Sequence, residues 1–247
     1  MSRLKVLYGF HAVMARIRAD ASSIEAVLYD ASRKDRRMQD FLRCAKEASV
    51  RLIAADEQRL WGLAGNLQHQ GVVARANNLP LAQNLTELLD GISGTPLLLV
   101  LDGVTDPHNL GACLRVADAA GAHAVIAPRD RSVGLNATAA KVASGAAESV
   151  PYITVTNLAW ALRELKDAGV WVIGTAGEAT ASLYETKLDG PVAIVVGAEG
   201  KGMRRLTHET CDEVVSIPIA GAVESLNVSV ASGVCLFEAV RQRAVKK

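Results

Sequence analysis

Short apolar segments alternate with helical patterns over residues 96–245 of this chain. The clearest segments are Leu97–Leu101 and Val192–Val196, where every residue is aliphatic. A strand that is apolar at every position is typical of a parallel sheet whose two faces are both covered by helices. We therefore expect an α/β fold with a parallel sheet, in which binding sites form at the carboxyl ends of the strands.

The spacing of apolar residues predicts the individual elements. In the larger part, strands are expected at 97–102, 123–127, 151–155, 170–174, 191–197 and 213–217, and helices at 109–120, 136–144, 157–168, 203–209 and 227–243. In the smaller first part, helices are expected at 10–19, 36–48 and 57–64, and strands at 24–29, 51–54 and 71–76. Helix breakers flank a short helical pattern in between. We therefore divide the chain into a small α/β domain (1–76), a linker (77–94) and a larger domain (95–247).

Charge is distributed unevenly along the chain, although the net charge is only +1. Residues 1–75 hold 13 Lys and Arg against 8 Asp and Glu, a balance of +5, whereas the remainder holds 14 against 18, a balance of −4. A basic small domain is typical of proteins that bind an anionic polymer such as nucleic acid. A solvated charged face without a partner is the competing interpretation.

Several classes of protein are disfavoured by what the sequence contains. Its four cysteines are scattered, and neither a C-x-x-C pair nor a metal-spaced histidine cluster occurs, so neither a disulfide framework nor a metal site is expected. The first ten residues have no long apolar core of the signal-peptide kind, and the apolar runs are too short to cross a bilayer. We therefore expect a cytoplasmic protein that does not interact with membranes.

Three polar turn motifs follow predicted strands of the larger domain, at Asp102–Arg115, Val195–Gly202 and Ile217–Ser229. The second motif has neither the G-x-G-x-x-G spacing of dinucleotide sites nor the P-loop pattern, which argues against a nicotinamide dehydrogenase. Its glycines allow a ligand to approach the backbone closely. Glu199 within it would repel phosphate but suits a cationic or hydrogen-bond-donating ligand. A plain structural turn is the alternative.

The polar residues of the other two motifs have structural alternatives as well. Asn109 stands at or near the start of a predicted helix, where Asn is a good N-cap. Arg115 lies among apolar residues of that helix, which is unusual without an anionic partner. Ser225 and Asn227 precede the last helix, and either could cap it. That helix also has a smooth face of small residues, which could pack in the core or against a second subunit.

Together the three motifs resemble those of the SpoU (TrmH) branch of the SPOUT RNA methyltransferases, over roughly residues 96–245. The first domain resembles the L30e-like RNA-binding domain of some members. The resemblance implies a deep trefoil knot, a homodimer and S-adenosylmethionine as cofactor. The residues that match the catalytic set are Asn109, Arg115, Glu199, Ser225 and Asn227. The residues expected to contact the cofactor are Thr175, Ala176, Gly177, Gly197, Ile217 and Leu226.

The layout of the chain is similar to that of members that methylate the 2′-hydroxyl of a guanosine in the peptidyl-transferase loop of 23S rRNA. We expect Arg115 to bind a phosphate beside the target ribose and to lower the pKa of its hydroxyl, because a guanidinium whose pKa exceeds about 12 is a poor base. Asn109 and Glu199 would orient Arg115 and the hydroxyl. The residues expected to contact RNA phosphates are Arg3, Lys5, Arg33, Lys34, Arg36 and Arg37, with Arg16 and Arg18 as further candidates.

Two other functions remain open at this point. The same chemistry could act on tRNA or on another rRNA loop. A non-catalytic RNA-binding factor for ribosome assembly belongs to a different class, and it would not need all five residues of the matched catalytic set.

Overall fold

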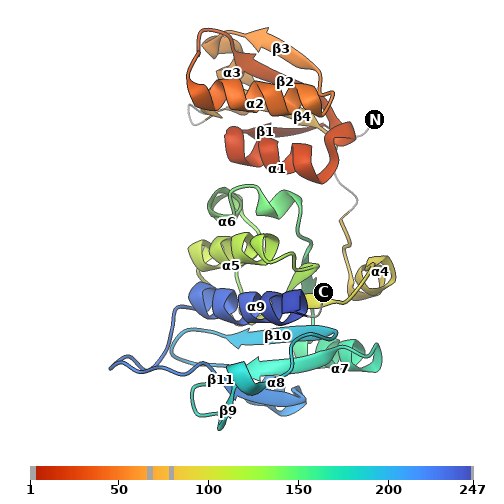
Figure 1. Ribbon diagram of the computed structural model, residues 1–247, viewed down its shortest axis with the longest axis vertical. Coiled ribbons are helices and arrows are strands. Elements are labelled where there is room, and N and C mark those ends of the chain that lie inside the picture. Colours follow the sequence, from red (N-terminus) through yellow and green to blue (C-terminus); the bar gives the residue numbers. More distant parts are fainter. Residues whose placement is uncertain (1–3, 66–68, 78–80, 246–247) are drawn as a thin grey trace. The chain divides into compact units, whose positions relative to one another are not determined.

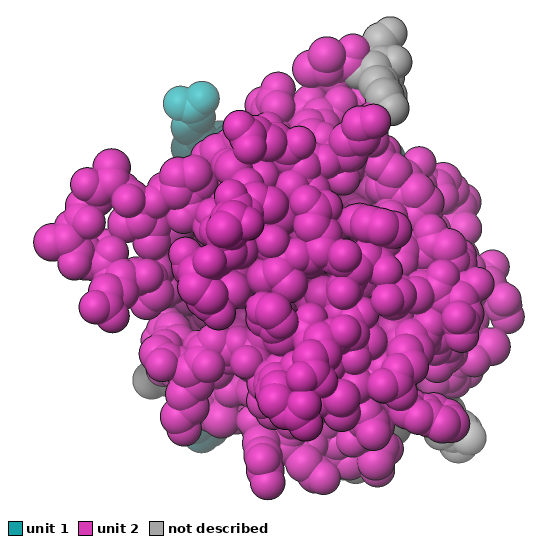
Figure 2. All heavy atoms as spheres, turned by 90° about the horizontal axis from the view of Figure 1, so that it is seen from below, with its two compact units in different colours: residues 1–81, 144–149 teal, residues 82–143, 150–247 magenta. Residues whose placement is uncertain are grey.

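The computed structural model describes residues 4–65, 69–77 and 81–245. Contacts divide the chain into two compact units, residues 1–81 with 144–149 (unit 1) and residues 82–143 with 150–247 (unit 2), which Figure 2 distinguishes by colour. Each unit is described by itself. No helix among the described residues is long and apolar enough to span a membrane.

Unit 1 is built on a mixed four-stranded sheet in the order β1-β4-β2-β3 (Figure 1). Its strands are β1 (Lys5–Tyr8), β2 (Ile24–Asp30), β3 (Leu52–Ala55) and β4 (Val72–Ala76), and its α-helices are α1 (Phe10–Asp20), α2 (Arg36–Glu47) and α3 (Glu57–Ala64). Phe10 and Phe41 pack edge to face in the core, with ring centroids 5.5 Å apart. The sequence reading missed β1, because only Leu7 of its four residues is buried and the apolar pattern is correspondingly weak.

Unit 2 contains a seven-stranded sheet in the order β7-β6-β5-β10-β8-β11-β9, and every pair of neighbouring strands is parallel. The strands are β5 (Leu97–Asp102), β6 (Ala124–Pro128), β7 (Tyr152–Val155), β8 (Trp171–Thr175), β9 (Ala181–Ser182), β10 (Val192–Gly197) and β11 (Glu213–Ser216). The helices are α4 (Leu85–Gly91), α5 (Pro107–Ala119), α6 (Ala137–Val142), α7 (Leu158–Asp167), α8 (Arg205–Thr210) and α9 (Val228–Val245). Each strand predicted here is found to within one residue, whereas the two-residue β9 was missed.

Helices cover both faces of the unit 2 sheet. Leu98 and Val100 of β5 share a core with residues of α7 and α4. On the other side α5 and α9 pack against each other (Figure 1), and α9 contacts β10 and β5. The prediction of a parallel sheet covered on both faces is therefore confirmed. Helix α4 lies in the segment that we expected to be a linker, and its Leu85 and Leu88 are buried in the core of unit 2.

The register of the sheet brings the three motifs to one edge. Asp102 at the end of β5 pairs with Gly197 at the end of β10, and β10 is followed across the sheet by β8 and β11. The first motif follows β5, the second follows β10 and the third follows β11. These neighbouring parallel strands therefore deliver the motifs to the same carboxyl edge.

Candidate functional site

The second motif forms a tight turn that presents Glu199 at the surface. Ala198 N donates to Gly202 O at 3.1 Å, and Gly202 N donates to Ala198 O at 2.9 Å. A Cβ on Gly197 would lie 2.1 Å from the carbonyl carbon of Gly202, so this position accepts only glycine. Gly200 has a φ of 71°, which favours glycine as well. The glycines therefore shape the turn itself.

Glu199 is the shared acceptor of a polar cluster drawn from all three motifs. Asn109 Nδ2 donates to Glu199 Oε1 at 3.4 Å, and Asn227 Nδ2 donates to the same oxygen. The backbone N–H of Val228 also donates to it, at 3.3 Å, and Asn227 Nδ2 donates to Asn109 Oδ1 at 3.0 Å. All of these hydrogen bonds to the carboxylate reach Oε1. Glu199 Oε2 therefore has no hydrogen-bond donor within the described residues and, because Glu199 is exposed, is available as an acceptor.

The two asparagines differ in their structural roles. The side chain of Asp106 caps α5 by accepting from His108 N at 2.9 Å, so the capping interpretation is wrong for Asn109, which lies inside the helix. Asn227 does cap α9, because its Oδ1 accepts from Ser229 N at 2.9 Å. Its Nδ2 is then directed to the cluster. The side chain of Asn109 does not cap the helix, so both its Nδ2 and its Oδ1 are used in hydrogen bonds with Glu199 and Asn227.

Arg115 lies apart from this cluster within one chain. It is exposed on α5 and forms no hydrogen bond or ion pair with any residue that the structure describes. Six residues of α-helix separate it from Asn109, which corresponds to about 120° around the helix axis and about 9 Å along it. No anionic side chain among the described residues pairs with Arg115, so its guanidinium is open to a partner from outside the chain.

A cavity of about 400 Å³, here called the loop cavity, opens where the turns after β8, β10 and β11 meet. It is lined by all six residues predicted to contact a cofactor, namely Thr175, Ala176, Gly177, Gly197, Ile217 and Leu226. Glu199 and Ser225 line it too. Figure 1 shows that the segment between β11 and α9 extends outward before it returns to α9. The sequence reading missed His208 and Met203, which also line the cavity because α8 begins just beyond the second motif.

A second cavity of about 580 Å³, here called the helix cavity, shares Glu199 with the loop cavity and is also lined by Asn109. Ala198, Lys201, Gly202, Met203 and Val228 line both cavities as well. The turn of the second motif therefore forms a common wall, with the Asn109, Glu199 and Asn227 cluster beside it. One ligand on each side would meet at Glu199.

Five charged residues that the sequence analysis did not assign to the site line the helix cavity: Asp102, Asp106, Arg131, Lys201 and Arg204. The carboxylate of Asp102 is fully buried and accepts from Arg204 Nε at 2.6 Å and from Arg204 N at 2.8 Å. The available signal was positional, because Asp102 is the charged residue that ends the apolar β5 strand and Arg204 lies two residues past the second motif.

The cysteines near the site are not nucleophiles. Cys113 on α5 lies 3.7 Å from the hydroxyl of Ser232 on α9, and burial raises the pKa of Cys113 to about 11. Burial raises the pKa of Cys235 to about 12. Both thiols therefore stay protonated near neutral pH.

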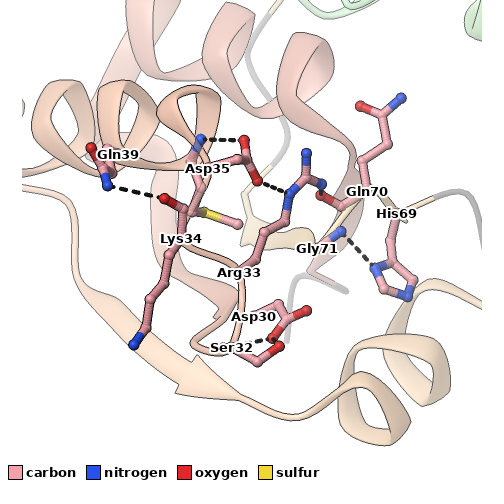
Figure 3. A network of polar contacts seen from close by, with 10 residues as sticks. Asp30, Ser32, Arg33, Lys34, Asp35, Gln39, His69, Gln70 and Gly71 are labelled. Carbon is pink, nitrogen blue, oxygen red and sulfur yellow. Dashed lines mark hydrogen bonds and ion pairs between the residues drawn. The ribbon is translucent and has the colours of Figure 1, made fainter.

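In unit 1, Arg33 is already engaged within the fold (Figure 3). Its Nε donates to Asp35, and its Nη1 donates to the carbonyl of Gln70 at 2.6 Å. Its guanidinium also lies 5.0 Å from the centroid of the Phe10 ring. Lys34 extends away from this network in Figure 3. Of these two neighbours, Lys34 is therefore the freer cation.

The other basic residues of the predicted RNA-binding set also differ in availability. Arg36 is 96% exposed, with only a 3.9 Å contact to Asp40, while Arg37 lies over the Phe10 ring and 3.1 Å from His11 Nε2. Lys5 Nζ forms a 2.6 Å ion pair with Glu148, and Arg3 lies outside the described residues.

Arg16 is 1% exposed and pairs with Glu148, which belongs to the same unit. Its Nη1 also donates to the carbonyl of Asn77 at 2.8 Å. The prediction of Arg16 as an RNA contact is therefore wrong, because a buried guanidinium cannot reach a phosphate in solution.

Both parts of the chain match known protein families. The model of the SpoU rRNA Methylase family matches residues 96–237, and a model described as RNA 2′-O ribose methyltransferase substrate binding matches residues 6–82. A protein of Ralstonia nicotianae named 23S rRNA (guanosine-2′-O-)-methyltransferase RlmB is 73% identical over 245 residues, which cover 99% of this chain and 98% of the relative.

Solved structures show the same fold. The crystal structure of an RNA 2′-O ribose methyltransferase matches with a TM-score of 0.72 and 28% identity, over 98% of this chain and 90% of that chain. The TrmH/SpoU tRNA modifying enzyme of A. aeolicus matches with a TM-score of 0.58 and 29% identity, over 64% of this chain and 81% of its own. These likenesses confirm the predicted fold class, an α/β domain of SpoU type with a parallel sheet, preceded by a small α/β domain.

Proposed function

Because this chain belongs to the SpoU rRNA methylase family, we propose that it transfers a methyl group from S-adenosylmethionine to the 2′-hydroxyl of a guanosine ribose in 23S rRNA. The guanosine and the 23S rRNA are taken from the name of the 73% identical relative. The observation that carries the chemistry is the pair of cavities that share the Glu199 turn as a wall. A cytoplasmic location follows from this substrate.

The loop cavity fits S-adenosylmethionine in size and in chemistry. Its volume of about 400 Å³ lies within the range of small-molecule sites. Ile217, Ile219 and Leu226 provide an apolar surface for the adenine, and the carboxylates of Glu178 and Glu224 suit the cationic end of the molecule. When bound, the cofactor supplies a methyl group that its sulfonium has already activated. No metal ion is required for such a transfer.

The residues of the polar cluster act on the acceptor in the helix cavity. The amides of Asn109 and Asn227 hold Glu199 through Oε1, which leaves Oε2 to accept the hydrogen bond of a ribose 2′-hydroxyl. Removal of that proton by a positioned side chain typically contributes about 10²- to 10⁴-fold to the rate. Ser225 lines the loop cavity, and Asn227 holds the shared wall in place through its hydrogen bond to Glu199.

We infer that Arg115 completes this site in a homodimer. It is exposed on α5, the helix that packs against α9, and no residue in the described part of the chain pairs with it. Helix α9 itself exposes Val230 and Phe237, one above the other at i and i+7, with 51% and 49% of their surface accessible. A second copy packed on this face would cover the apolar stripe and bring its Arg115 toward a neighbouring site. There the guanidinium would bind an RNA phosphate and favour ionisation of the hydroxyl.

Unit 1 would bind the RNA through its free cations. Lys34, Arg36 and Arg37 are the best candidates, because Arg33 and Lys5 are paired within the fold. Arg3 remains a candidate by sequence alone. Such contacts give salt-dependent affinity and little sequence information, so a structured RNA loop must supply the specificity.

The direct test is incubation of the protein with labelled S-adenosylmethionine and unmodified 23S rRNA fragments, followed by mapping of the methylated nucleoside. We expect label on the ribose of one guanosine and none on tRNA. Label on tRNA alone would favour the tRNA alternative, toward which the A. aeolicus likeness points, although that match covers only 64% of this chain. Calorimetry with the cofactor tests the non-catalytic alternative, which predicts no binding.

A further inference from the structure

A third cavity adjoins the helix cavity and shares no lining residue with the loop cavity. It has a volume of about 390 Å³ and is here called the side cavity. Arg131 and Arg204 line both the helix cavity and the side cavity, so two guanidinium groups stand where these cavities meet. The side cavity lies beyond the residues that the proposed methyl transfer uses.

Arg204 is held rigidly at this junction. Asp102, whose side chain is fully buried, accepts from both the side-chain Nε and the backbone N–H of Arg204. The side chain of Arg204 is still 41% exposed. An arginine that is oriented by a buried carboxylate while its outer edge stays open is pre-organised to bind a second anion.

Arg131 is the freer of the two. It is exposed in the loop after β6, its backbone has a φ of 61°, and its side chain forms no hydrogen bond or ion pair with the rest of the described chain. A positive φ is uncommon for a residue with a side chain. Arg131 therefore lines the junction without a partner among the described residues that would neutralise it.

The rest of the side cavity suits a nucleobase rather than a second phosphate. Leu206 on α8 is 46% exposed and offers apolar surface. The exposed Thr156 offers a hydroxyl, and Asn157 offers its Nδ2, because its Oδ1 already caps α7. Asp130 also lines this cavity, and its carboxylate would repel an anion bound there. Anions are therefore favoured at the arginine junction and disfavoured inside.

We propose that the side cavity holds the base of the nucleotide next to the methylated one, and that Arg131 and Arg204 bind the phosphate between the two. This inference rests on the proposed function, because the acceptor ribose in the helix cavity belongs to a polymer and carries a phosphodiester on each side. Arg131 and Arg204 are then positioning residues for the RNA. They act on the placement of the target ribose and leave the cofactor untouched.

The test compares Arg131→Gln with Arg129→Gln, a neighbouring exposed arginine that lines neither cavity. The substrate is the shortest 23S rRNA fragment that the wild-type protein methylates, prepared unmodified or with one uncharged methylphosphonate on the 5′ or the 3′ side of the target nucleoside. A hydrogen bond to a charged group contributes enough that its loss lowers kcat/KM by about 10- to 100-fold. We expect that loss for Arg131→Gln and less than a twofold change for Arg129→Gln, with equal cofactor affinity.

The charge and the base are tested separately. With the wild-type protein, one of the two methylphosphonate substrates should lower kcat/KM as much as the Arg131→Gln substitution does. With the Arg131→Gln variant, the same substrate should lower kcat/KM only slightly further. An abasic residue beyond this same linkage should lower wild-type kcat/KM, and Leu206→Ala should remove most of the difference between abasic and normal RNA.

Two results would overturn the inference. One is that the methylphosphonates lower kcat/KM of the Arg131→Gln variant by the same factor as that of the wild type. The other is that an abasic neighbour leaves the wild-type kcat/KM unchanged. If the wild-type protein methylates no RNA at all, the proposed function itself fails. The two failures are therefore distinguishable.

Discussion

The two units use their charged residues in opposite ways. In unit 2 the polar groups of three motifs converge on one oxygen of Glu199 and leave the other oxygen open, while Arg115 and Arg131 have no partner among the described residues. In unit 1 several basic side chains form ion pairs within the fold; Arg16 and Lys5, for example, both pair with Glu148. The number of charged residues therefore says less about a binding surface than whether each charged side chain is exposed and unpaired in the folded chain.

The largest effect is expected from Glu199→Gln, which tests whether the unit 2 cluster is a reaction site. Glutamine keeps an oxygen for the two asparagine amides but cannot accept a proton from the ribose. Methyl transfer should fall by about 10³-fold, within the range for loss of a general base. Single-turnover transfer of labelled methyl groups to RNA measures it.

The control for Glu199→Gln is cofactor affinity measured by calorimetry, which should change by only a few fold because Oε1 keeps its donors. Undiminished methyl transfer would mean that the cluster is structural. The polar groups of unit 2 would then serve the fold, as the ion pairs of unit 1 do.

The next effect tests the opposite claim, that the buried charge of unit 1 serves the fold. Glu148→Ala leaves Arg16 buried without its partner, which should cost about 3–5 kcal/mol. Hydrogen exchange of the α1 amides should speed up, while exchange in β5 and β10 stays unchanged. Replacement of both residues, Arg16→Met with Glu148→Leu, should cost much less, because no unpaired charge remains. If α1 exchange is the same in Glu148→Ala and the wild type, the ion pair does not hold unit 1 together.

The difference between the units also explains what could be predicted from sequence. Apolar runs such as that of β5 specify a parallel sheet, and a parallel sheet puts the following turns at one edge. All six residues predicted to contact a cofactor line one cavity for this reason. The prediction of Arg16 failed because the amphipathic pattern of α1 does not reveal that Glu148, distant in sequence, is its partner. Arg131 and Arg204 were missed because their role depends on two cavities that only the folded chain defines.

A smaller effect is expected from Arg115→Ala, which asks whether the free guanidinium of unit 2 serves its own chain. Turnover should fall by about 10²-fold, because a charged hydrogen bond to phosphate is removed. Mixed dimers decide the location. If Arg115 acts across a twofold interface, Arg115→Ala and Glu199→Gln subunits together form one intact site per mixed dimer, and random mixing restores about a quarter of wild-type activity. Without such recovery Arg115 would act within its own chain, and the dimer proposal would fail.

The smallest effects separate free from engaged cations on unit 1. Lys34→Ala, Arg36→Ala and Arg37→Ala should each weaken RNA binding by a few fold, and removal of one cation that neutralises a phosphate should lower the slope of log affinity against log salt by about one. Arg59→Ala on α3 is the matched exposed control and should change neither quantity.

Arg33→Ala should instead lower the stability of unit 1, because its side chain ties Asp35 to the Gln70 carbonyl. Filter binding across a salt series measures the first group, and urea unfolding measures the last. An unchanged salt slope in all three variants would place the RNA-binding surface elsewhere on the protein.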